Sequence, residues 1–142
     1  MKTLEQVREN FSHDVYASGT TGIYIQYAKP GHCVVTLTPD ERHFNALGPA
    51  MGAVYNTMAD FAFAVASNYE FDGPVGVVTL DSNIRFLNPM KGTILMGAAN
   101  VIRDGSRTCF YQAEITDDLG TKIASVSITG YKFIKKQPSP ED

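Results

Sequence analysis

The segment from Pro49 to Asn68 constrains the fold more than any other part of the chain. It reads PAMGAVYNTMADFAFAVASN, with small or apolar residues at nearly every position. Pro49 suits the first position of a helix, because its missing N–H would have no intrahelical partner there. A helix that is apolar on several sides is covered nearly all round. We therefore expect a long buried helix that ends near Ser67 or Asn68 and carries one carboxylate, Asp60, in its middle.

The rest of the chain is rich in β-forming segments separated by turn signals. Strands are expected at residues 22–28, 32–38, 75–88, 92–103, 106–116 and 121–134. The first two are joined by KPG and form a hairpin, and MKG, DG and DDLG join the later ones. Residues 75–88 are either one long strand or a bent pair. This order favours one long helix wrapped by a strongly curved antiparallel sheet.

The two ends of the chain are polar. Residues 3–12 read as a short amphipathic helix, with Thr3 as N-cap and Gln6 completing a capping box. SGTTG then breaks the pattern, and residues 39–48 read as a loop. The last residues, 135–142, are polar and contain proline, which predicts a disordered tail. With 142 residues in all, we expect one domain over residues 1–134, of which 1–15 form the N-terminal helical segment.

Composition and charge exclude several classes of protein. The net charge of -3 gives no reason to expect nucleic acid as a partner. The N-terminus has no apolar secretory region. The longest apolar stretch, around residues 50–66, is interrupted by Asn56, Thr57 and Asp60, and it is shorter than the roughly 20 residues that a bilayer requires. We therefore expect a cytoplasmic protein without a membrane partner.

The cysteines and histidines do not form a metal-binding pattern. Cys33 and Cys109 each lie in an alternating apolar segment, which is typical of buried, inert thiols. His13, His32 and His43 are far apart in the sequence, and none has a second ligand type at metal spacing. We expect neither a metal nor a cofactor.

Several motifs, in order and with their spacings kept, resemble the hotdog-fold acyl-CoA thioesterases of the PaaI-like, phenylacetate type. The resemblance covers about residues 40–134. Asn45, Met51-Gly52-Ala53 and Met58-Ala59-Asp60 match the family's Asn, His-Gly-Gly and Leu-Ala-Asp positions. The later matches are VVTLDSNIRFLNP (77–89), VIRDGSRT (101–108) and GTKIASVSITGYKF (120–133).

The resemblance implies an α+β hotdog fold and the hydrolysis of an aryl- or medium-chain acyl-CoA thioester. In that reading, Asp60 is the general base or the nucleophile. The backbone N–H of Gly52, at the positive end of the helix dipole, would hold the oxyanion. The side-chain amide of Asn45 would contact the same carbonyl, and Thr79 would orient the attacking water.

The spacing of two of these residues adds a constraint. Gly52 and Asp60 are eight residues apart in one helix, which places them about 12 Å apart along its axis. That is too far for both to act on one carbonyl. Two antiparallel copies of the helix would bring Gly52 of one subunit beside Asp60 of the other. We therefore expect a homodimer with two composite sites, arranged as a dimer of dimers.

Substrate contacts are expected from the same helix and from scattered cations. Met51, Tyr55, Met58 and Phe61 are the expected wall of the acyl pocket. Arg85, Arg103 and Arg107 are candidates for the phosphates of CoA, with Arg103 and Arg107 favoured by the RDGSR turn.

Alternatives remain for most of these residues. Met51 replaces the family's histidine and cannot donate a hydrogen bond, so a catalytically weak or inactive acyl-CoA-binding protein is the main alternative. A hydratase would need a histidine about 14 residues before the acid, whereas His43 and Asp60 are 17 apart. Asp60 could also be structural, bonded to Asn56 or Thr57 one turn back. Gly52, Asn45 and Thr79 could serve helix packing, a turn and strand packing, respectively.

Overall fold

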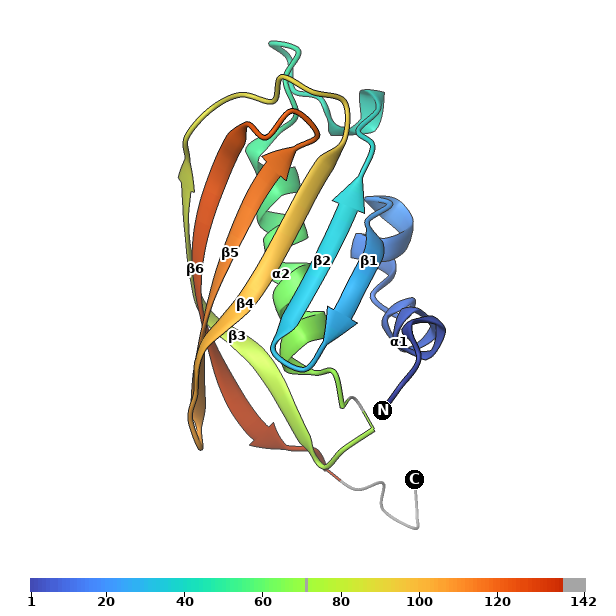
Figure 1. Ribbon diagram of the computed structural model, residues 1–142, viewed down its shortest axis with the longest axis vertical. Coiled ribbons are helices and arrows are strands. Elements are labelled where there is room, and N and C mark those ends of the chain that lie inside the picture. The colour runs from blue at the N-terminus through green and yellow to red at the C-terminus, as the bar shows by residue number, and fades with distance from the viewer. Residues whose placement is uncertain (71, 137–142) are drawn as a thin grey trace.

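The computed structural model describes residues 1–70 and 72–136 and contains one six-stranded sheet that wraps one long helix (Figure 1). The helical elements are α1 (Leu4–Phe11), the π-turn η1 (Tyr16–Thr20), the 3-10 turn η2 (Glu41–His43) and α2 (Gly52–Ser67). The strands are β1 (Tyr24–Lys29), β2 (His32–Leu37), β3 (Val75–Phe86), β4 (Leu95–Asp104), β5 (Thr108–Asp117) and β6 (Lys122–Ile134). Of the expected tail, residues 137–142 lie outside the described residues.

The sheet has the order β1-β2-β4-β5-β6-β3, and every neighbouring pair is antiparallel. Strand β3 follows α2 in sequence but pairs with β6, at the far edge from β1. The sheet curves around α2, as Figure 1 shows. This arrangement confirms the predicted α+β hotdog fold, with a long central helix and a curved antiparallel sheet.

The core lies between α2 and the concave face of the sheet. From α2, Met58, Phe63 and Val65 are almost completely buried, and they meet β-strand side chains such as Leu95 and Ile115. Because these side chains are packed on every side, truncation of Met58 to Ala would cost roughly 2–5 kcal/mol of folding free energy. Cys33 and Cys109 are buried free thiols, as predicted.

The start of α2 differs from the sequence prediction. Pro49 lies outside the helix, which begins at Gly52 with Met51 in an extended N-cap conformation. The carbonyl of Pro49 accepts the N–H of Asn45, and Ala50 forms an isolated bridge with Phe44. The segment before the helix is thus held as a closed loop, so Pro49 serves the loop rather than the first helical turn.

The helix α2 is also less covered than expected. Ala53, Asn56 and Asp60 lie on one stripe of the helix and are exposed. The stripe lies beside β3, the edge strand of the sheet, whose Thr79 is hydrogen-bonded to Asp60. The prediction of a helix covered nearly all round was therefore wrong for this one face, which is open and partly polar.

Smaller features separate the expected from the observed elements. The capping box of α1 is confirmed, with the Gln6 N–H bonded to Thr3 Oγ1 at 3.2 Å. The expected loops at SGTTG and residues 39–48 contain η1 and η2. β4 begins at Leu95 rather than residue 92, and residues 75–86 form one strand rather than a bent pair.

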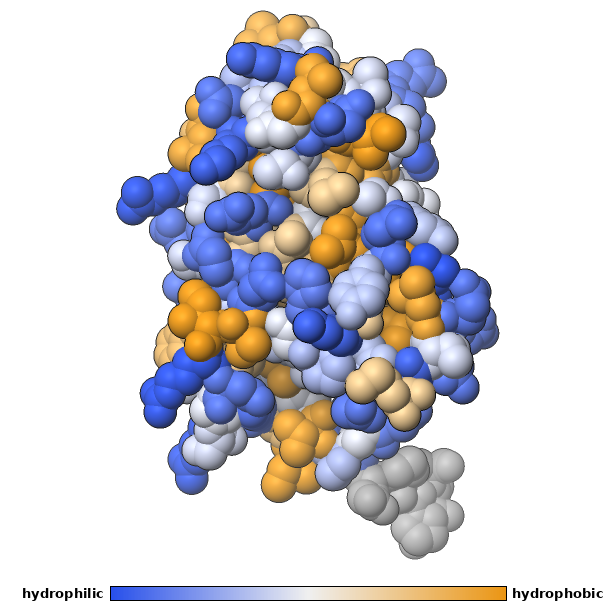
Figure 2. Space-filling model, in the orientation of Figure 1, coloured by the Kyte–Doolittle hydropathy of each residue, from blue (hydrophilic) through white to orange (hydrophobic). Residues whose placement is uncertain are grey.

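The outer surface is mixed. Figure 2 shows hydrophilic side chains over most of the visible face, with hydrophobic ones in separate small groups. Within residues 1–70 and 72–136, no helix has the length and apolarity that crossing a bilayer requires. The same residues contain no cluster of three or more His, Cys, Asp or Glu side chains placed to hold a metal ion.

Candidate active site

Asp60 and Thr79 form the centre of the candidate site. The Thr79 hydroxyl donates a hydrogen bond of 2.8 Å to Asp60 Oδ1, and so links the middle of α2 to β3. Asp60 is exposed, so the carboxylate faces solvent beside the edge strand. The alternative that Asp60 is bonded to a residue one turn back is wrong, because Thr57 donates its hydroxyl to the carbonyl of Ala53 instead.

An irregularity in β3 brings two polar side chains to the same helix. The pairing with β6 shifts between Thr79 and Asp81, so Leu80 is an extra residue in the strand. Thr79 lies opposite Gly130 of β6, and Ser82 lies opposite Ile128. Ile128 and Gly130 are two positions apart, so both lie on the inward face of β6. Without the bulge, Thr79 and Ser82 would face opposite sides of the sheet. With it, both point to α2, where Ser82 lies at 3.5 Å from Asn56.

The Asp60 side of α2 forms one wall of a pocket of about 370 Å³. Its other wall is the segment around η1, including Asp14, Val15 and Tyr16. The edge-to-face contact between Phe11 and Phe61, with ring centroids 6.4 Å apart, fixes α1 against α2 and so sets the position of this segment. The pocket is therefore built by two parts of the chain that are far apart in the sequence, residues 14–17 and 56–64.

Asp14 is a second carboxylate in this pocket. Partial burial, together with the negative charge of Asp60, raises the pKa of Asp14, and the nearby His13 acts in the opposite direction. Asp14 was not among the predicted site residues, because it lies between two helical elements and belongs to no motif. The only available signal was a lone acid after the short first helix.

Gly52 opens the helix at the other end of the candidate site. As the first helical residue, its N–H has no acceptor within α2. A Cβ atom at this position would lie 2.8 Å from one ring carbon of Phe86 and 2.9 Å from another. A side chain at position 52 would therefore require the Phe86 ring of β3 to move. This packing role of Gly52 is compatible with an N–H that has no acceptor within α2. Gly52 lines a separate pocket of about 490 Å³ with Tyr55 and Phe86.

The loop before Gly52 is held by backbone and side-chain hydrogen bonds. Asn45 Oδ1 accepts the N–H of Leu47 at 2.8 Å, so Asn45 supports a turn, as the alternative reading held. His43 is buried, with Nδ1 bonded to the N–H of Asp40 and Nε2 bonded to the carbonyl of Thr21. Both ring nitrogens of His43 are engaged with backbone, which supports a structural role rather than that of a hydratase base.

The four residues expected to line an acyl pocket lie in four different environments. Phe61 lies in the Asp60 pocket, and Tyr55 lies in the Gly52 pocket. Met51 is exposed beside the helix start, with 56% of its surface accessible. Met58 faces the core and is fully buried, which favours packing over substrate contact.

The arginines expected to hold the CoA phosphates do not lie beside the exposed stripe of α2 in their own subunit. In the sheet, Arg85 lies opposite Ser125 of β6, and Arg103 lies opposite Phe110 of β5. The residues on either side of Ser125 and Phe110 are buried in the core. Arg85 and Arg103 therefore lie on the outer face of the sheet. Arg107 follows the β4–β5 turn, at the end of the sheet opposite to Gly52.

Comparison with known proteins identifies the family. Residues 47–124 match the model of the thioesterase superfamily. The chain belongs to the thioesterase superfamily. It is a thioester hydrolase, and the PaaI-like resemblance is confirmed.

Individual relatives agree with this assignment. An Archaeoglobus fulgidus protein named as a candidate esterase is 26% identical over 111 residues, covering 78% of this chain and 70% of its own. The E. coli PaaI protein of the phenylacetic acid degradation operon superposes with a TM-score of 0.78 at 25% identity, covering 92% and 96% of the two chains. A hypothetical thioesterase from Streptococcus pneumoniae, solved with coenzyme A, has a TM-score of 0.75 at 22% identity and covers 92% and 99%.

Proposed function

We propose that this thioester hydrolase cleaves an aryl- or medium-chain acyl-CoA, with Asp60 as the general base or nucleophile. The observation that carries the proposal is the hydrogen bond from Thr79 to Asp60 Oδ1 on the open stripe of α2. One carboxylate oxygen is held in place, while the group remains accessible from solvent. A carboxylate held in this way can take the proton of an attacking water.

In the general-base form of the reaction, water adds to the thioester carbonyl carbon as Asp60 takes one of its protons. The carbonyl oxygen becomes an oxyanion, which the N–H of Gly52 from a second subunit stabilises. The tetrahedral intermediate then collapses, the carbon–sulfur bond breaks, and the proton held by Asp60 passes to the leaving thiolate. The products are a carboxylic acid and free CoA.

The composite site requires a second copy of the chain. In one subunit, Gly52 and Asp60 line different pockets and are separated by about 12 Å of helix. Strand β3 offers a long free edge beside the exposed stripe of α2, and such edges pair readily with another strand. Its exposed apolar residues are Val75, Val78, Leu80 and Phe86. These features support a homodimer through β3, with a dimer of dimers as the larger assembly.

Two further observations bear on the substrate. The related Streptococcus pneumoniae protein was solved with coenzyme A, which supports a CoA thioester for this chain too. The pocket beside Asp60, of about 370 Å³, is large enough for an aryl or medium-chain acyl group. Arg85, Arg103 and Arg107 remain candidates for the phosphates, and their positions away from α2 mean that a partner subunit would present them.

Met51 supports one alternative, a binding protein with little or no turnover. A thiol-release assay on a panel of aryl- and acyl-CoA esters separates the two functions, with binding measured on the same panel. We expect turnover of at least one ester. Binding without thiol release by any ester would favour the alternative.

The same protein, fractionated on a sizing column, tests the composite site. Thiol release should elute with a dimer or a larger assembly. Full activity in a monomer fraction would rule out the shared site.

A further inference from the structure

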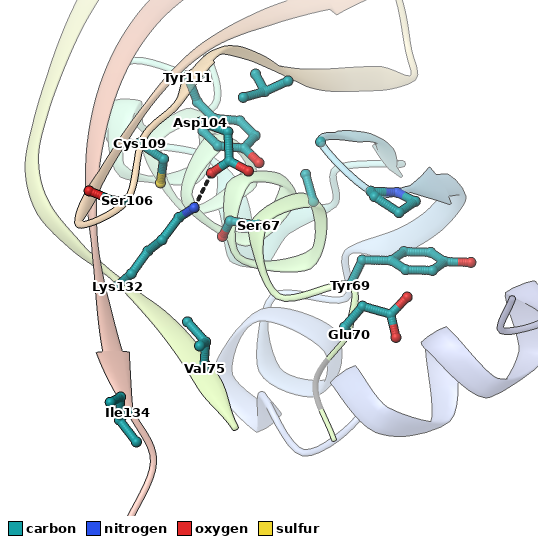
Figure 3. A pocket seen from close by; sticks show the side chains of 14 residues that line it. Ser67, Tyr69, Glu70, Val75, Asp104, Ser106, Cys109, Tyr111, Lys132 and Ile134 are labelled. Carbon is teal, nitrogen blue, oxygen red and sulfur yellow. Dashed lines mark ion pairs between the residues drawn. The ribbon is translucent and has the colours of Figure 1, made fainter. Parts of the chain in front are cut away.

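A further pocket lies at the opposite end of α2 from Gly52. It has a volume of about 670 Å³ and is bounded by the end of α2, the β1–β2 turn and the ends of β3, β4 and β6. Figure 3 shows its lining side chains. Val75, Val101 and Ile134 give it apolar walls, and Asp104 and Lys132 form an ion pair within it. A volume of this size suits a small organic ligand.

The hydroxyl of a nearly buried tyrosine, Tyr111, faces this pocket. Tyr111 is nearly buried, with 4% of its surface accessible. Its ring packs edge-to-face on Phe63, with centroids 5.0 Å apart, so its direction is fixed. The hydroxyl has no hydrogen-bond partner among residues 1–70 and 72–136, and Figure 3 shows it directed towards the pocket interior. The hydroxyl is therefore available to hydrogen-bond a ligand in the pocket.

The electrostatic environment of the pocket is negative. Asp104 is paired with Lys132, which leaves the Glu70 carboxylate at the opposite rim without a balancing charge among the lining residues. The C-terminal end of the α2 dipole adds partial negative charge. At Cys109, burial raises the pKa of the thiol, and the Asp104 charge raises it further by more than Lys132 lowers it.

The pocket is separate from the proposed catalytic site. Asp60, Thr79 and Gly52 do not line it, and about one and a half turns of α2 separate Asp60 from Ala66 at its edge. Arg103 lies on the outer face of the sheet, whereas Asp104 pairs with the buried Cys109 and faces inwards. The negative pocket is therefore distinct from the basic positions considered for CoA phosphates.

We propose that the pocket lined by Tyr111, Asp104 and Glu70 binds a small organic cation, a primary ammonium group on an apolar body. The ammonium group donates to the Tyr111 hydroxyl oxygen and is attracted by the unbalanced Glu70 carboxylate. The apolar body packs on Val75, Val101 and Ile134. A carboxylate of the same shape is repelled by the Glu70 charge, and a neutral alcohol lacks the charge that Glu70 attracts.

Three probes of matched shape test the proposal on the full-length protein: 2-phenylethylamine, 3-phenylpropanoate and 2-phenylethanol. Binding is measured by calorimetry and by NMR shifts of the pocket residues. We expect the amine to bind at least about fivefold more tightly than either of the other probes. Tyr111→Phe should weaken amine binding by roughly threefold to tenfold, because it removes only the hydroxyl. Tyr27→Phe, on the exposed side of β1, is the matched control.

Two further variants make the outcome decisive. Asp104→Asn leaves Lys132 without its partner, so the preference should move from the amine towards the carboxylate. Asp60→Asn should bind the amine as wild type does, whatever its effect on thioester hydrolysis. Equal binding of the three probes, no binding at millimolar concentration, or wild-type amine affinity in folded Tyr111→Phe would overturn the proposal.

Discussion

The Thr79 hydroxyl donates to Asp60 Oδ1 at 2.8 Å across the boundary between β3 and α2. This bond fixes the carboxylate in one orientation, and no donor among the described residues 1–70 and 72–136 is bonded to Oδ2. The free oxygen can therefore take a proton from water. The bulge at Leu80 follows Thr79 and turns Ser82 to the same face, so both hydroxyl side chains point to the helix.

Thr79→Val should lower the turnover number while leaving KM nearly unchanged. Valine keeps the shape of threonine but cannot orient the carboxylate. A typical neutral hydrogen bond contributes about 0.5–1.5 kcal/mol, so the expected loss is roughly twofold to tenfold. Steady-state thiol release measures it, and Thr79→Ser is the control that should restore most of the rate. An unchanged turnover number in Thr79→Val would show that the bond does not serve catalysis.

Gly52→Ala should lower both stability and activity. Its Cβ atom would lie 2.8 and 2.9 Å from two ring carbons of Phe86, so the ring or the helix start must move. Overpacking of this kind typically costs about 1–3 kcal/mol, measured by denaturant unfolding. The double variant Gly52→Ala with Phe86→Leu should recover part of the loss. A single variant as stable as wild type would mean that the Phe86 ring moves aside at no cost.

Met51→His should raise turnover. Position 51 is exposed at the N-cap of α2, and its present side chain makes no capping hydrogen bond. Histidine there could donate to the thioester carbonyl, which methionine cannot do. Met51→Ala is the control and should not raise the rate. Turnover that stays the same in Met51→His would show that this position does not limit the reaction.

Asp117 should make folding stability dependent on acid pH. Burial alone would raise the pKa of Asp117, but hydrogen bonds from the N–H groups of Gly92, Lys91 and Thr121 outweigh it and hold that pKa well below its usual range. A carboxyl whose pKa is lowered on folding stabilises the folded state above its unfolded pKa of about 3.9. That contribution is lost as the pH falls below this value.

Asp117→Asn should therefore be less stable than wild type at neutral pH. Denaturant unfolding across pH 7 to about pH 2 should show the difference shrinking below about pH 4, where Asp117 of the unfolded wild-type chain begins to gain its proton. Glu114→Gln, on the opposite face of β5, is a control for the loss of one charge. A difference between wild type and Asp117→Asn that stays constant with pH would contradict the assignment.

Local signals in the sequence predicted much of the fold. The apolar run of α2, the KPG hairpin and the Thr3–Gln6 capping box act over a few residues, and each appears in the structure. The contacts around Asp60 are of another kind. Thr79 and Ser82 face the same helix because of a bulge that alternation alone does not encode. Asp14 reaches the Asp60 pocket through the packing of Phe11 on Phe61.

Pro49 shows a different limit of prediction. Its ring suits both a first helical turn and the end of a closed loop. The bonds from Asn45 to Pro49 and from Met51 to His43 select the loop, so the helix begins at Gly52. These bonds depend on the position of η2, which the polar 39–48 segment did not reveal.

The most direct test of the central claim is thiol release from the best acyl-CoA substrate by wild type and Asp60→Asn at matched protein concentration. Asparagine keeps the shape and can still accept the Thr79 hydroxyl, so folding and assembly should be unchanged. Loss of the base is expected to lower the turnover number by about 10²–10⁴-fold. Equal turnover by the two proteins would contradict the assignment of Asp60 as base or nucleophile.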